Sequence, residues 1–65
     1  MLAKELIRLV EIAIEHKLFH AAGYLIQVTN NAWIRYEFKN ENIDYDVAIA
    51  SLINDYNETV GANDK

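Results

Sequence analysis

The chain has 65 residues, no cysteine and no proline, and ten acidic against six basic side chains give it a formal net charge of −4. A chain of this length forms one domain near the lower limit for independent folding, because it buries only about 60% of its unfolded surface. The absence of cysteine excludes disulfides and thiolate metal sites, and the scarcity of glycine and proline favours helices joined by short turns.

The first predicted element is a helix over about residues 2–16, because its apolar residues recur at helical spacing. Two apolar residues, Ile12 and Phe19, fall outside this stripe. Between Glu15 and Phe19 the stripe shifts by roughly a quarter to a third of a turn. We therefore expect a tight turn near His16 and Lys17 that folds the next helix back as an αα-hairpin. The predicted apolar face of this first helix consists of Leu2, Leu6, Ile7, Leu9, Val10, Ala13 and Ile14.

The second predicted helix covers about residues 18–39 and has two apolar sides in a helical projection. Tyr24, Ile34 and Phe38 fall on one side, which a partner or a neighbouring helix of the chain would have to cover. Trp33 falls on the opposite, broader side and is predicted to anchor the core. Gly23 lies inside the helix and predicts a close helix–helix contact. The broad side comprises Leu18, Ala21, Ala22, Leu25, Ile26, Val28, Ala32, Trp33 and Tyr36.

The same segment allows a β-hairpin, which would give an α-β-β-α order. Residues 34–39 alternate between apolar and charged, as a half-buried strand does, and Asn30-Asn31 could form a two-residue turn. However, pairing across such a turn places Ile26 opposite Arg35, so neither face of the hairpin would be apolar. A helix separates the apolar from the polar residues of this segment better than the hairpin does, and we favour the helix.

The third predicted helix spans about residues 45–59, with Asp44 as its N-cap and Asn42 as the second choice. Gly61 is placed to end it, so the domain covers residues 1–61 and residues 62–65 form a frayed tail. The predicted fold is a small all-α, three-helix domain that pairs with a second copy. The stripe that the third helix should bury comprises Tyr45, Ala48, Ile49, Leu52, Ile53, Tyr56 and Val60.

No pattern supports a metal site. His16 and His20 are four residues apart, but Glu15 is the one carboxylate nearby, and a structural zinc site takes four ligands. Residues 40–46 alternate as a calcium loop begins, yet the positions that need glycine and glutamate hold Tyr45 and Ser51. We expect no metal and no other cofactor.

Catalysis is also disfavoured. Ser51 is the only serine, and the predicted helix that carries it has no histidine to activate it. The charges, Lys4 and Glu5 among them, break any signal-peptide run, and no apolar stretch approaches the roughly 20 residues that span a bilayer. We therefore expect a non-enzymatic cytoplasmic protein with no membrane association.

The charge distribution disfavours direct binding to nucleic acid, because the half from Asn40 onward is acidic and would repel phosphates. We expect an inhibitor or adaptor that binds another protein, with Tyr24, Ile34 and Phe38 as apolar anchors. Acidic side chains would steer it toward a basic surface. Two alternatives stay open: a nucleic-acid mimic that displaces DNA or RNA from a basic site, and a purely structural, self-assembling helical protein. The predicted steering residues are Glu41, Asp44, Asp55 and Glu58.

Overall fold

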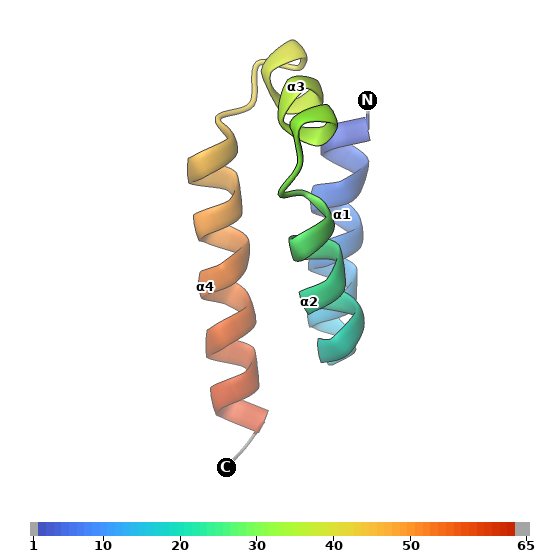
Figure 1. Ribbon diagram of the computed structural model, residues 1–65. Helices are drawn as coiled ribbons and strands as arrows, with labels where there is room; N and C mark the ends of the chain where they lie inside the picture. Colours follow the sequence, from blue (N-terminus) through green and yellow to red (C-terminus); the bar gives the residue numbers. More distant parts are fainter. Residues whose placement is uncertain (1, 64–65) are drawn as a thin grey trace.

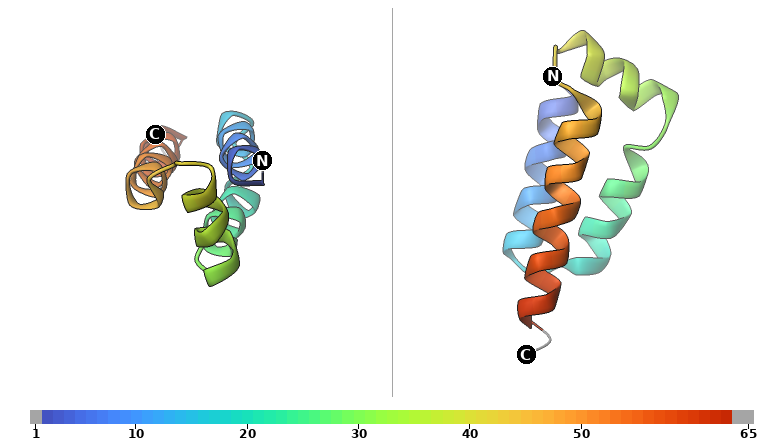
Figure 2. Two further views of the ribbon diagram at one scale, coloured as in Figure 1. Left: turned by 90° about the horizontal axis from the view of Figure 1, so that it is seen from above. Right: turned by 90° about the vertical axis from the view of Figure 1, so that its left-hand side faces the viewer.

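The computed structural model describes residues 2–63, and over that range it contains helices and no strand (Figure 1). The all-α prediction is therefore confirmed, and the α-β-β-α alternative is wrong. α1, α2 and α4 lie side by side along the long axis, and α3 crosses one end of this group (Figures 1 and 2). The molecule measures 40 × 17 × 16 Å. The helices are α1 (Leu2–Glu15), α2 (Phe19–Val28), α3 (Ala32–Asn40) and α4 (Tyr45–Asn63).

The turn between α1 and α2 lies at His16 and Lys17, as predicted. The Lys17 amide donates to the carbonyl of Ile14 at 2.9 Å, and the Leu18 amide donates to the carbonyl of Ala13 at 2.8 Å. This pair of bonds is the Schellman motif, which places one residue in the left-handed region. Lys17 takes that position with φ = 61°, although glycine is the residue that adopts it without steric cost.

A second Schellman motif ends α3. Asn42 has φ = 58°, and the amide of Ile43 donates to the carbonyl of Phe38 at 2.9 Å. Asparagine is one of the few residues besides glycine that adopts this conformation readily. The chain is thereby redirected into α4.

Asp44 begins α4, because its Oδ1 accepts a hydrogen bond from the Val47 amide at 3.1 Å. The predicted N-cap is confirmed. The predicted end at Gly61 is wrong, since α4 continues to Asn63 and Gly61 does not have a positive φ. Residues 62 and 63 of the predicted tail are thus helical, and residues 64–65 lie outside the described residues.

The single helix predicted over residues 18–39 is wrong: it is two helices separated at residues 29–31, which makes four helices in residues 2–63 instead of three. The Thr29 hydroxyl donates to the carbonyl of Ile26 at 2.6 Å. The Asn31 side chain accepts from the Ile34 amide at 3.0 Å and donates to the Val28 carbonyl at 2.6 Å. Side chains of this kind replace backbone partners at helix ends. They let α2 stop and α3 start in a new direction.

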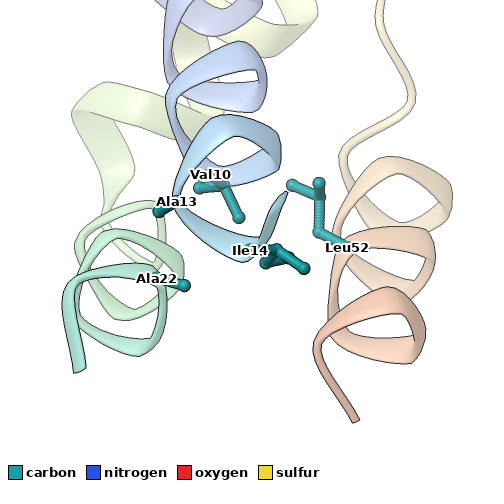
Figure 3. Packing of buried hydrophobic residues seen from close by; sticks show 5 residues of the cluster. All are labelled: Val10, Ala13, Ile14, Ala22 and Leu52. Atoms are coloured by element: carbon teal, nitrogen blue, oxygen red, sulfur yellow. The ribbon is translucent and has the colours of Figure 1, made fainter. Parts of the chain in front are cut away.

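Two apolar clusters form the core, and Ile7 and Ile49 pack against both. The first joins α1, α2 and α4 (Figure 3). The second lies at the end where α3 crosses α1 and α4. The buried members of the first are Val10, Ala13, Ile14, Ala22 and Leu52, and those of the second are Ala3, Leu6, Ile34 and Phe38.

Candidate functional site

Two of the three predicted apolar anchors lie in the core. Ile34 is 9% exposed and Phe38 is fully buried, and both pack against Ala3 and Leu6 of α1. The Phe38 ring also meets the Tyr45 ring edge to face, with centroids 5.2 Å apart. The expectation that Ile34 and Phe38 are left for a partner is therefore wrong. The difference between the expected and the observed burial arises from the break at residues 29–31, which changes the rotation of α3 relative to a continuous helix.

The same change exposes the aromatic residues that were predicted to be buried. Trp33 is 84% exposed and Tyr36 is 63% exposed, so the prediction of a tryptophan core anchor is wrong. These two residues are three apart on α3, a spacing that places them on the same side of a helix. We call Trp33 and Tyr36 the aromatic face. Tyr24 of α2, the third predicted anchor, is 67% exposed.

α3 is held in this orientation by contacts on its other sides. The Arg35 guanidinium lies over the Tyr45 ring, 4.3 Å from its centroid, and donates to Asn30 Oδ1 at 3.0 Å. A cation over an aromatic face is attracted by the ring quadrupole. The Tyr45 hydroxyl lies 3.4 Å from the Thr29 hydroxyl, so one ring connects α3, α4 and the α2–α3 break. The aromatic face is thus on an element that is braced from the opposite side.

Glu41 was predicted to steer a partner, but its carboxylate accepts hydrogen bonds from backbone amides at the start of α1. Its Oε2 accepts from the Ala3 amide at 3.0 Å, and its Oε1 accepts from the Lys4 amide at 3.3 Å. The first amides of a helix have no partner within the helix, and a carboxylate there also meets the positive end of the helix dipole. The hydrogen bond from Ala3 is the main reason that the pKa of Glu41 is lowered from its ordinary value. Glu41 therefore connects the end of α3 to the start of α1.

The remaining predicted acids separate into two places. Asp44 caps α4, whereas Asp55 and Glu58 line a cleft of about 260 Å³ farther along that helix. Glu11 and Glu15 of α1 line the other side of the same cleft. We call these four carboxylates the acidic cleft. The grouping of Glu11 and Glu15 with Asp55 and Glu58 depends on how α1 packs on α4, so the sequence gives no direct signal for it.

The residues considered for metal binding and catalysis lie apart from these features. His16, His20 and Ser51 are all exposed, and the α1–α2 turn separates the two histidines. Across residues 2–63, no three His, Cys, Asp or Glu side chains are grouped so that they could hold a metal ion. Within the same range, no helix combines the length and the apolar content that crossing a membrane requires.

No family model, curated protein or solved structure matches this chain.

Proposed function

We propose that this chain is a non-enzymatic interaction module, an inhibitor or adaptor, that binds a partner protein through the aromatic face. The observation that carries the proposal is the 84% exposure of Trp33, the only tryptophan of the chain. Tryptophan and tyrosine are the residues most often found as energetic hot spots of protein interfaces, with arginine. Their rigid rings bury a large area on binding at little cost in side-chain entropy.

The charge of the chain supports a basic partner surface. The acidic cleft places four carboxylates along one side of the molecule, and the whole chain carries a net charge of −4. Such a field accelerates association with a surface of opposite charge. In this proposal the aromatic face supplies most of the binding energy, and the acidic cleft increases the rate of association.

The test is affinity capture from the source cells with the full chain, followed by mass spectrometry and calorimetry on the captured protein. Trp33→Ala should weaken binding by at least about 30-fold, as expected for a hot-spot residue. Val47→Ala is the matched control, because Val47 is 67% exposed on α4 and lies outside the aromatic face. Equal binding by the Trp33→Ala variant would overturn the proposal.

The same experiment separates the two alternatives. A nucleic-acid mimic requires binding that falls steeply with salt and depends on Asp55 and Glu58 more than on Trp33. A purely structural protein would capture no partner protein, whatever its own oligomeric state. Either result contradicts the proposed role of the aromatic face.

A further inference from the structure

The outer side of α1 carries an apolar row that the core does not use. Leu9 is 50% exposed and Ile12 is 39% exposed, and neither belongs to the two buried clusters. Glu5 and His16 continue this row toward the two ends of α1, since the spacing 5, 9, 12, 16 alternates steps of four and three residues. That alternation is the seam of a coiled coil.

Leu9 and Ile12 line a groove of about 270 Å³ together with Glu5 and Arg8. These four residues stand at positions i, i+3, i+4 and i+7 of one helix. Four residues with this spacing form the hole that receives one side chain, the knob, from a facing helix. The four lining residues come from one helix and the groove is open to solvent, so it can receive a side chain of a second helix but does not enclose a small molecule.

The charges beside the row indicate which helix fits. If a second copy of α1 packs antiparallel, Ile12 of one copy enters the hole around Leu9 of the other. Glu5 then lies opposite the partner copy's His16, and Arg8 lies near the partner copy's Glu15. All four of these charged or polar side chains are exposed in the single chain. A parallel pair would instead place Glu5 directly opposite Glu5 of the other copy and would leave Arg8 beside Ala13, without a carboxylate partner.

We infer that this chain forms a homodimer in which two copies of α1 pack antiparallel, with Leu9 and Ile12 at the centre. This interface lies on α1, whereas the aromatic face lies on α3, so the inference does not depend on the proposed function. A contact of two helical heptads is small compared with standard protein interfaces. The dimer should accordingly dissociate at roughly micromolar concentrations.

Sedimentation equilibrium on the full chain tests the inference. The average mass should rise from that of one chain toward that of two between about 0.1 μM and 100 μM. Leu9→Glu should raise the dissociation constant at least about tenfold, because it buries an unpaired charge at the centre of the interface. Val47→Glu also replaces an apolar side chain by a carboxylate, but at an exposed position of α4. It should leave the dissociation constant unchanged. A wild-type chain that stays monomeric over this range overturns the inference.

Charge reversal tests the antiparallel arrangement without changing the apolar row. Arg8→Glu and Glu15→Arg should each weaken the dimer, since each places like charges together in both symmetric contacts. An equimolar mixture of the two variants should recover dimerisation, because both contacts of the mixed dimer then join opposite charges. Circular dichroism confirms that each variant is folded. If the mixture is no better than either variant alone, the antiparallel pairing is wrong.

Discussion

The rotation of α3 can be tested by replacing one buried and one exposed aromatic residue of that helix with leucine. Phe38 is fully buried and contacts the Tyr45 ring, whereas Trp33 is 84% exposed. Phe38→Leu loses apolar volume in the core and the edge-to-face contact, which together cost about 1–2 kcal/mol. Trp33→Leu removes almost no buried surface and should change the free energy of unfolding by less than about 0.5 kcal/mol.

The assay is urea unfolding followed by far-UV circular dichroism, with the m-value compared among variants to confirm that each unfolds in one cooperative step. In a thermal melt, the Phe38→Leu variant should unfold about 4–8 °C lower for each kcal/mol lost. Phe38→Ala is less informative, because its cost of about 3–5 kcal/mol is as large as the stability expected of so small a domain. If Trp33→Leu is as costly as Phe38→Leu, α3 does not have the rotation described above, and the proposal for the aromatic face fails with it.

Three further predictions concern the backbone and one carboxylate. Lys17→Gly should raise the free energy of unfolding by about 1 kcal/mol in a urea melt, because glycine adopts the positive φ of this position without steric cost. Gly23→Ala should also raise the free energy of unfolding by up to about 1 kcal/mol, because alanine favours the helix more than glycine does and its added Cβ would meet the Tyr56 hydroxyl at an ordinary 3.7 Å. A lower free energy of unfolding would show that the contact is tighter than this. The pKa of Glu41 is lowered in the folded chain, so its carboxylate stabilises the fold above its ordinary pKa, and this contribution is lost as the pH falls through the lowered value. Urea melts at several pH values should therefore show the stability difference between wild type and Glu41→Gln shrinking on acidification, and a constant difference would contradict the capping role.

Local features of the chain were predictable because they depend on neighbours in the sequence. The bounds of α1, the turn at His16 and Lys17, and the Asp44 N-cap all follow from helical spacing and from capping chemistry. Most of the buried stripe of α4 was also predictable, with Leu52 at its centre. Ile53 is the exception, since it is 42% exposed.

The break at residues 29–31 had a signal in the sequence that helical spacing alone did not weigh. Thr29, Asn30 and Asn31 are three consecutive residues whose short polar side chains compete with the helix for backbone groups. Two of them bond to backbone groups of the neighbouring helices, and Asn30 accepts from Arg35. A continuous projection across them assigned Trp33 to the core and Phe38 to the surface, which reverses their positions in the structure.

The sequence by itself determined that this protein is helical and where most of its helices begin, because hydrogen bonds within a helix and at its caps join residues a few positions apart. Only the tertiary structure decided which side of α3 faces inward, since the rotation of a helix after a break is set by what it packs against. Ala3 and Leu6 of α1 receive Phe38, and the Ala3 amide binds Glu41. These contacts join residues more than thirty positions apart, and they are what leaves Trp33 and Tyr36 facing the solvent.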